Sequence, residues 1–466
     1  MNRKTFLIVL VIFFAISLSA YPSKLIVNVA APLGPDNTAD VQAALDQCVG
    51  YSGPGCTVQL AAGIYKTKQL FAKDFHGTFK GRGMDVTIIQ ALPNLPVSQE
   101  QPIVWNSPPS VDNHYPMLVL FFGGDISVSD MTIRALEPNQ LEEWNIVEGE
   151  RTTYMWALLD FMGQSEKMNV VVTRVELQGA YDESGPAYSD HYNATGLSLD
   201  PYPTLYHPSP GYLSGTFRIS ACRFDTFVEG IAAGFLREAP LTIGGSPSEA
   251  NLIQNCDYGA VLINLDSSVV NFSHNDVSVV GPSAFGGIVA YQSPELGSIE
   301  TPTSFLIDHN SFKAHGSSES GIAILDLFGA GKTADVVISN NEIFIQPSEN
   351  GPAFAGIQNV FTEGTVISNN RIVGSGLFGI VLFGDTQAMV KGNNVDGLAA
   401  GVAAIYLDSG TSNCTVVGSG KKTNVLDEGI NNTLVGVNNM NGNSPGPAIR
   451  EAMKRKMEMI KSLRKW

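Results

Sequence analysis

A short phrase ending in asparagine recurs between residues 252 and 393 and constrains the fold more than any other feature. The spacing between successive phrases is 20, 35, 31, 29 and 23 residues, with the asparagines at Asn255, Asn275, Asn310, Asn341, Asn370 and Asn393. A constant core with insertions of variable length is typical of a solenoid, in which each repeat forms one coil. We expect these asparagines at coil corners, because Asn tolerates left-handed backbone angles and its amide can bond to adjacent coils.

A second phrase, glycine followed by an apolar residue, alternates with the first. It opens runs of mostly apolar residues at Gly230-Ile231, Gly259-Ala260, Gly287-Ile288, Gly321-Ile322, Gly356-Ile357, Gly379-Ile380 and Gly401-Val402. Such β-rich runs, with little helical periodicity, indicate parallel strands stacked coil on coil. The expected fold is all-β, a single-stranded parallel β-helix. Because a solenoid can grow without limit, we assign residues 21–440 to one domain.

The beginning of the chain has the pattern of a secretory signal peptide. Basic residues Arg3 and Lys4 precede an apolar run from Phe6 to Ala20, which is too short for a comfortable membrane span. We therefore expect residues 1–20 to be removed and the protein to be secreted, either extracellular or periplasmic; an uncleaved anchor is the alternative. No later segment is apolar enough to span a membrane, so no transmembrane segment is expected after signal removal.

The last part of the chain, residues 441–466, reads as a linker followed by a basic amphipathic helix. Ile449, Met453, Met457 and Ile460 form one apolar stripe among lysines and arginines. The chain has a formal net charge of −16, and an acidic body favours docking of this helix on its own protein. Disorder and binding to a membrane or partner are the alternatives. The same negative charge argues against nucleic acid, and against an acidic glycan held without a bridging cation.

Five cysteines in a secreted chain indicate some disulfide use. Cys48 and Cys56 enclose a short Gly/Pro-rich segment, so we expect a disulfide between them. Cys222 and Cys256 form either a bridge between coils or two buried thiols. Cys414 is left over and is expected to be buried.

The segment after the signal carries a family resemblance. Residues 39–48 predict a short helix, and residues 36–46, 57–65 and the Gly81-Arg82-Gly83 turn resemble the entry segment of the pectate-lyase-like superfamily. This resemblance implies a right-handed parallel β-helix whose N-terminal helix caps the first coil. It implies function only broadly, because the superfamily contains lyases, hydrolases, epimerases, phage tailspikes and proteins without known activity. Its polygalacturonase and pectate-lyase catalytic phrases are absent here.

Two long insertions, residues 136–155 and 181–212, interrupt the early coils and are rich in aromatic and acidic residues. Aromatic rings beside carboxylates suit a sugar-binding cleft, since rings stack on sugar faces while acids bind hydroxyls. Equally, the loops could fold over the solenoid and bury their rings. The expected substrate-binding residues are Trp144, Tyr188, Tyr192, Tyr202 and Tyr206.

The outward positions of the later glycine-led strands, two and four residues after each glycine, are almost all apolar, which places any charged cleft on the early coils. A loop, the C-terminal helix or a partner could cover this apolar stripe. Alternatively, the assumed alternation of inward and outward side chains is shifted by one residue. The candidate catalytic residues are Asp160, Asp190, His191, Arg237 and Glu238. No metal-binding motif is present and no cofactor is required, although calcium could serve as the bridging cation.

These observations favour a secreted carbohydrate-active protein, a polysaccharide lyase or glycoside hydrolase with its cleft at the long early loops. The alternative is a non-catalytic surface or matrix protein that binds glycan or a partner through the β-helix side. The expected ligand in both cases is a polysaccharide or glycan. The missing catalytic phrases leave open whether the chain is an enzyme.

Overall fold

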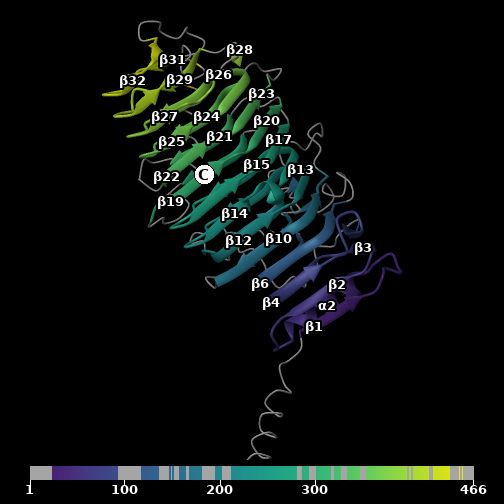
Figure 1. The fold of residues 1–466 in the computed structure, drawn as a ribbon. Coiled ribbons are helices and arrows are strands. Elements are labelled where there is room, and N and C mark those ends of the chain that lie inside the picture. The colour runs from purple at the N-terminus through teal and green to yellow at the C-terminus, as the bar shows by residue number, and fades with distance from the viewer. Residues whose placement is uncertain are drawn as a thin grey trace, which may run out of the picture.

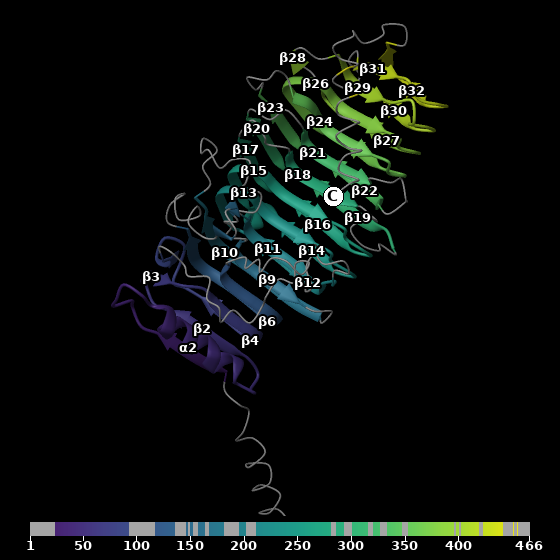
Figure 2. The same ribbon diagram turned by 180° about the vertical axis from the view of Figure 1, so that it is seen from behind.

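The computed structural model is a parallel β-helix whose coils stack from the N-terminal to the C-terminal end (Figures 1 and 2). Strands of successive coils pair in parallel to form one continuous sheet. The described residues are 24–92, 117–135, 146–147, 150–151, 157–163, 167–180, 195–201, 211–280, 286–292, 301–315, 320–326, 333–346, 353–395, 398–399, 402–418, 423–440, 451 and 454.

Each coil contributes strands to three faces, here named A, B and C in chain order. Face A begins with the first residues of β4 (Leu70–Lys80) and β6 (Met117–Arg134). It continues through β9 (Ala157–Gly163), β11 (Thr195–Pro201), the ends of β13 (Arg223–Gly234) and β15 (Leu252–Ile263), β18 (Gly286–Gln292), β21 (Ser320–Asp326), β24 (Ala353–Val360), the end of β26 (Arg371–Phe383), β29 (Ala403–Leu407), β31 (Thr423–Asp427) and β33 (Val437–Asn439).

Faces B and C complete each coil. Face B contains β1 (Leu25–Val29), β2 (Cys56–Leu60), parts of β4, β6 and β10 (Lys167–Gln178), β12 (Ser214–Ser220), β14 (Pro240–Gly244), β16 (Val269–Ser273), β19 (Thr303–Asp308), β22 (Thr333–Ser339), β25 (Val366–Ser368), β27 (Met389–Lys391), β30 (Thr415–Val417) and β32 (Thr433–Val435). Face C contains β3 (Gly63–Thr67), β5 (Thr87–Ala91), the remaining parts of β6, β10, β13, β15 and β26, β17 (Asp276–Val280), β20 (Ser311–His315), β23 (Glu342–Ile345) and β28 (Leu398–Ala399). A separate antiparallel pair joins β7 (Ile146–Val147) and β8 (Glu150–Arg151).

An asparagine ladder runs along the corner between faces B and C. Its rungs are Asn251, Asn275, Asn310, Asn341, Asn370 and Asn393. From Asn251 to Asn370, each side-chain Nδ2 donates to the Oδ1 of the next rung at 2.9 to 3.1 Å, and Asn393 is the last acceptor. The side-chain Nδ2 also donates to a backbone carbonyl oxygen. All rungs are buried, so these bonds satisfy amides that water cannot reach.

The expectation for the first rung was wrong, because Asn251 and not Asn255 belongs to the ladder. Asn255 is exposed, and its Nδ2 donates to Asp225 Oδ1 at 2.7 Å. The sequence predicted that one corner asparagine would both take the left-handed backbone angle and bond to the adjacent coil. In the structure, two neighbouring residues share these roles. The residue before each of the last five rungs takes the left-handed angle, with φ between 55° and 65° at His274, His309, Asn340, Asn369 and Gly392.

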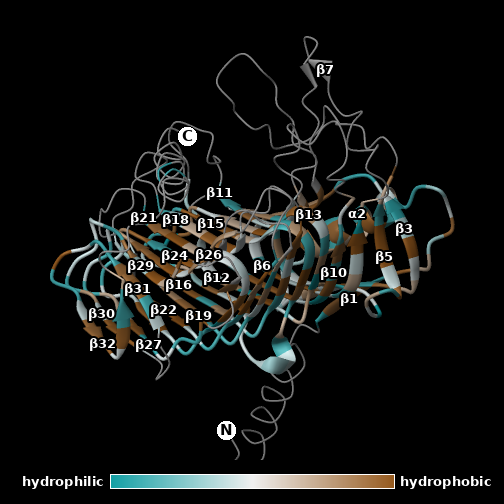
Figure 3. Cartoon of the chain, turned by 90° about the horizontal axis from the view of Figure 1, so that it is seen from above, coloured by the Kyte–Doolittle hydropathy of each residue, from teal (hydrophilic) through white to brown (hydrophobic). Residues whose placement is uncertain are grey.

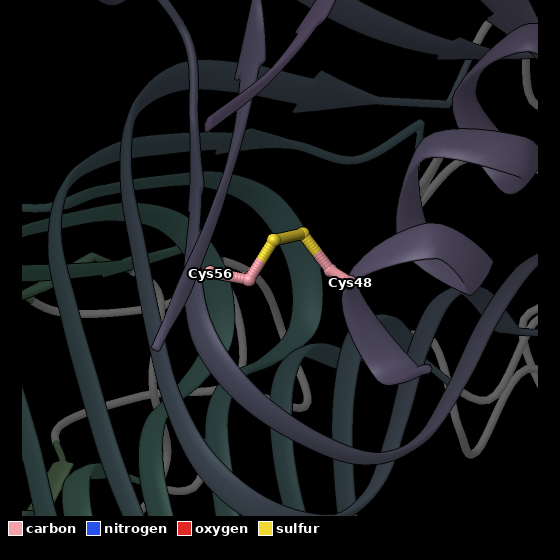
Figure 4. Close-up of a disulfide and its surroundings, with 2 residues drawn as sticks. All are labelled: Cys48 and Cys56. Atoms are coloured by element: carbon pink, nitrogen blue, oxygen red, sulfur yellow. A yellow bond between two sulfur atoms is a disulfide. The ribbon is translucent and has the colours of Figure 1, made fainter. Parts of the chain in front are cut away.

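The N-terminal segment contains the helix that the sequence predicted, α2 (Thr38–Val49). It buries Val41, Ala44, Leu45 and Cys48 and packs against β1 and β4. The predicted disulfide joins Cys48 at the end of this helix to Cys56 at the start of β2, with 5.4 Å between their Cα atoms (Figure 4). Cys222, Cys256 and Cys414 are free and buried. That α2 covers the open edge of the first coil stays a prediction.

Two separate hydrophobic clusters form on opposite sides of face A. The inward side chains of all three faces make the solenoid core, in which Phe121 and Phe161 stack with ring centroids 5.7 Å apart. The outward side chains of the late coils make a second cluster, here named the outer cluster. It contains Ala323, Leu325, Phe354, Ala355, Val360, Phe378, Val381, Phe383, Ala403, Tyr406 and Leu426. Face A is strongly apolar in this region (Figure 3).

The outer cluster confirms the alternation of inward and outward side chains assumed for the glycine-led strands up to Gly379, and shows that the apolar stripe is buried from Ala323 onwards. The last expected phrase, Gly401-Val402, was misplaced. The backbone of Ala404 lies against Gly379, so Ile405 points inward and Tyr406 outward. Residues 1–20, and all of 441–466 except helical Glu451 and Lys454, lie outside the described residues. No helix within the described ranges is long and apolar enough to cross a membrane.

Candidate functional site

Asp160 is the candidate catalytic residue whose setting is most unusual. It lies in the middle of β9, where Leu159 and Phe161 point into the solenoid core and Asp160 therefore points outward. Its side chain is nevertheless fully buried. Within the described residues, neither carboxyl oxygen has a hydrogen-bond partner. A buried acid without partners is costly, and such groups occur most often where function requires them.

Two further acids lie next to Asp160 on face A. The neighbouring strand β11 pairs Ser198 with Asp160 and carries Asp200 two residues later, so Ser198 and Asp200 share the outward side. The following strand, β13, carries Glu229 opposite Thr195 of β11. We name Asp160, Asp200 and Glu229, which share the outward side of face A, the acidic cluster; by register Asp200 is level with Gly234, five residues beyond Glu229 along β13. Its members come from three successive coils.

Hydrogen bonds and burial hold the acidic cluster in place. Ser198 donates its hydroxyl to Asp200 Oδ2, and Thr195 donates to Glu229 Oε2 at 3.1 Å. Ser198 and Thr195 are themselves buried, and Asp200 is only 3% exposed. Glu229 is partly exposed, which makes it the member most accessible to a ligand.

The charge of Asp200 acts on the pKa of both Asp160 and Glu229. Burial raises the pKa of Asp160 well above its usual range, and the charge of Asp200 raises it further. Burial likewise raises the pKa of Glu229 to about 7, with the Thr195 hydroxyl opposing and Asp200 adding to the shift. These shifts favour the protonated forms of Asp160 and Glu229.

Open space adjoins the cluster at Gly234, in the same outward row as Asp200. Gly234 is buried, yet a Cβ atom placed on it would meet no atom of the described residues within 4 Å. A Cβ placed on Gly230, in the same strand, would instead come within 2.7 Å of Ile253 Cγ2 and 2.8 Å of the Gly259 carbonyl oxygen. Ile253 belongs to the solenoid core, so the Gly230 contacts lie inside the solenoid, and only Gly234 leaves room for a Cβ atom.

Arg237 and Glu238 lie beyond the end of β13, at the turn from face A to face B. Arg237 Nε pairs with Asp266 Oδ2 at 2.9 Å, and its guanidinium lies 3.6 Å from the ring centroid of Tyr212. Glu238 is exposed with a φ of 49°. Their observed contacts fix the turn, and catalytic roles for them stay predictions. The other predicted site residues lie outside the described residues: Asp190, His191, Trp144, Tyr188, Tyr192, Tyr202 and Tyr206.

Sequence reasoning overlooked Asp200 and Glu229. The available signal was alternation: Leu197 and Leu199 point into the core, so Ser198 and Asp200 must share the other side. Glu229 directly precedes the Gly230-Ile231 phrase, whereas the predicted outward positions all follow the glycine. Neither signal could show that the two acids share the side of face A on which Asp160 lies, because that depends on coil register.

Metal binding was also considered at this site. Over the ranges that the structure describes, no three His, Cys, Asp or Glu side chains come together in a way that could hold a metal ion. The chemistry that the described residues can supply is proton transfer and charge stabilisation by carboxyl groups.

Comparisons with known proteins agree on the fold. No family model and no curated protein matches the chain. Among solved structures, it is similar to the A-module of the mannuronan C-5 epimerase AlgE6 of Azotobacter vinelandii, with a TM-score of 0.50 and 14% identity over 87% of this chain and 96% of that one. PfbA, a surface adhesin of Streptococcus pneumoniae, matches with a TM-score of 0.47 and 13% identity over 85% and 93%. A hyperthermoactive exopolygalacturonase of Thermotoga maritima gives 0.46 and 13% over 90% and 93%. The likeness to the AlgE6 A-module agrees with the parallel β-helix fold that the strand pairing defines.

Proposed function

We propose that this protein is a secreted glycoside hydrolase that acts on a polysaccharide at the acidic cluster. The observation that carries the proposal is the grouping of Asp160, Asp200 and Glu229 on three adjacent strands, with burial keeping part of the group protonated. Hydrolysis of a glycosidic bond needs one carboxylic acid to protonate the leaving oxygen and one carboxylate to activate water or attack the sugar. Several proteins of this fold bear names of polysaccharide-acting enzymes, which agrees with the proposal.

The differing environments assign the roles. Glu229 is partly exposed and titrates near neutrality, so it acts as the general acid. Asp200, which accepts a hydrogen bond from Ser198, acts as the carboxylate partner. Burial and the charge of Asp200 favour the protonated form of Asp160. A lyase would need a cation beside a substrate carboxylate. Arg237, the arginine among the predicted catalytic residues, is already bound to Asp266 and Tyr212, which favours hydrolysis.

The test is release of reducing ends from a panel of polysaccharides by wild type and by Glu229→Gln and Asp200→Asn. Removal of a general acid or base typically lowers the rate about 10²- to 10⁴-fold. The matched controls are Glu342→Gln and Asp276→Asn, which remove exposed acids in surface ion pairs on face C and should leave the rate unchanged. Full activity in Glu229→Gln would refute the assigned role.

A second candidate is a non-catalytic glycan-binding protein. The observation that favours it is the complete burial of Asp160 and Ser198, which keeps part of the cluster from direct contact with a polymer. In that case the protein would bind glycan without releasing reducing ends, and the two cluster variants would alter affinity alone.

A further inference from the structure

The outer cluster on face A needs a cover that the strands of the solenoid do not supply. Its members lie on the outward side of β21, β24, β26, β29 and β31, and all of them are buried. An outward side chain on a sheet is buried only where another layer of the protein lies over it. The described strands of these coils belong to the solenoid itself. The cover therefore comes from a segment outside these strands.

The chain leaves the described part of the β-helix at this surface. Met440, which directly follows the last strand β33, packs against the outer cluster. Two described residues further along the chain, Glu451 and Lys454, are helical and exposed. At about 3.6 residues per turn, Glu451 lies nearly opposite the apolar stripe predicted for this helix, and Lys454 lies to one side of the stripe. The helix therefore exposes its charged side, as expected when its apolar stripe is bound.

The dimensions of this helix match those of the outer cluster along the solenoid axis. A helix over residues 448–466 is about 28 Å long, at about 1.5 Å per residue. The outer cluster runs from Ala323 on β21 to Leu426 on β31, a stack that spans about 19 Å at about 4.8 Å between strands. Val289 and Tyr291 of β18 pack against it and extend the surface by one more strand. Because the helix starts from the C-terminal coil, it has to run back towards β18.

Charge adds to this match. Glu428 is exposed at the edge of the outer cluster, where it accepts a hydrogen bond from the Tyr406 hydroxyl at 3.0 Å. The predicted helix carries lysines and arginines around its stripe, and complementary charges favour one orientation of docking. We propose that residues 441–466 fold back along face A as a strap, in which the apolar stripe binds the outer cluster and the basic end reaches β18. The proposal gives this segment a binding site and a direction, whereas the sequence alone left docking, disorder and partner binding open.

Amide hydrogen exchange on the full chain tests whether the strap is bound. Residues 448–460 should exchange at least about tenfold more slowly in wild type than in the double variant Met453→Glu/Met457→Glu, because carboxylates on the stripe cannot stay on an apolar surface. The coils before β18 should exchange equally in both proteins, which shows that the variant is folded. Glu451→Gln, on the exposed side of the same helix, is the matched control and should keep the wild-type protection. Rapid exchange of residues 448–460 in wild type overturns the proposal.

Engineered cysteine pairs in the full chain test the direction of the strap. Ile449 and Ile460 lie about 16 Å apart along such a helix, which is more than a disulfide can span. Under oxidised glutathione, disulfides should form in Ile449→Cys/Leu426→Cys and in Ile460→Cys/Ala323→Cys, and not in Ile460→Cys/Leu426→Cys, as measured by mass spectrometry without reductant. A disulfide in the third variant alone overturns the direction. Disulfides between two chains, seen as covalent dimers, overturn the assignment of the strap to its own chain.

Discussion

At the residue scale, the chain keeps several acids buried, and not all of them belong to the acidic cluster. Asp385 follows the end of β26 and is fully buried. Its Oδ1 accepts bonds from the Thr362 backbone N–H at 2.7 Å, from the Thr362 hydroxyl at 2.8 Å and from Asn359 Nδ2 at 3.1 Å. Burial raises its pKa to about 8, with Thr362 opposing and the Asp408 charge adding to the shift. Asp385 is therefore a structural acid that stays protonated at neutral pH.

This raised pKa makes stability depend on pH. Between about pH 4 and pH 8 the unfolded chain has released the Asp385 proton while the folded chain retains it, so a rise in pH favours unfolding by about 1.4 kcal/mol per unit. Asp385→Asn keeps the acceptor and cannot titrate. We expect the difference in unfolding free energy between wild type and this variant to change by that slope across the window, measured by urea denaturation. Parallel curves for the two proteins would contradict the buried neutral acid.

The open space at Gly234 gives a second prediction at this scale. Because a Cβ atom there meets nothing within 4 Å, Gly234→Val should leave the melting temperature unchanged or slightly higher while filling the space beside Asp200. Glycan binding should weaken at least about tenfold, a loss of about 1.4 kcal/mol. The control is Gly230→Val in the same strand, which would collide with Ile253 and the Gly259 carbonyl and should lower the melting temperature. Unimpaired binding by folded Gly234→Val would remove this space from the site.

At the element scale, the asparagine ladder fixes the height of each coil on the next. Asn310 is a central, buried rung: its Nδ2 donates to Phe272 O and to Asn341 Oδ1, and its Oδ1 accepts from the backbone N–H and side chain of Asn275. Removing it leaves several buried polar groups without partners. Each such group costs about 1 to 3 kcal/mol.

We therefore expect Asn310→Ala to lower the unfolding free energy by about 2 to 5 kcal/mol. Asn169→Ala is the matched control, since Asn169 also bonds to adjacent coils, through Asp125 and Thr216, but is exposed. Water can replace those bonds, so its loss should be below about 1 kcal/mol. Denaturant unfolding of both variants measures the two losses of unfolding free energy. Equal losses would show that burial does not make the ladder's hydrogen bonds more stabilising than exposed ones.

The ladder also shows how far a sequence predicts such a fold. Five of its six rungs were readable, because each follows an apolar run and precedes a new strand. Asn251 was missed because a 3-10 turn (Pro247–Glu249) precedes it instead of an apolar run, and Asn255 fitted the phrase better. Asp160 was singled out by its place in an apolar strand. That Asp200 and Glu229 share its side of face A could not be predicted, because insertions of unknown path separate the three strands and only coil register aligns them.

At the scale of the whole molecule, the outer cluster needs a cover. Its side chains are at most 6% exposed although they point away from the solenoid axis, and Met440, at the end of the described domain, already packs against it. The sequence continues from Met440 into the expected amphipathic helix, whose apolar stripe matches such a surface and whose positive charge matches the acidic body. We therefore expect that removal of residues 441–466 exposes the outer cluster.

The truncated chain should bind more of a hydrophobic dye such as ANS and self-associate in sedimentation velocity, because a large exposed apolar patch drives association. Hydrolysis, if the acidic cluster performs it, should survive in the monomeric fraction, since the cluster lies several coils away along the solenoid and each coil contacts chiefly its neighbours. Adding Leu325→Ser to the truncated chain, on the newly exposed face, should reduce self-association. Unchanged dye binding on truncation would instead mean that the loops beside face A, and not the C-terminal segment, cover the outer cluster.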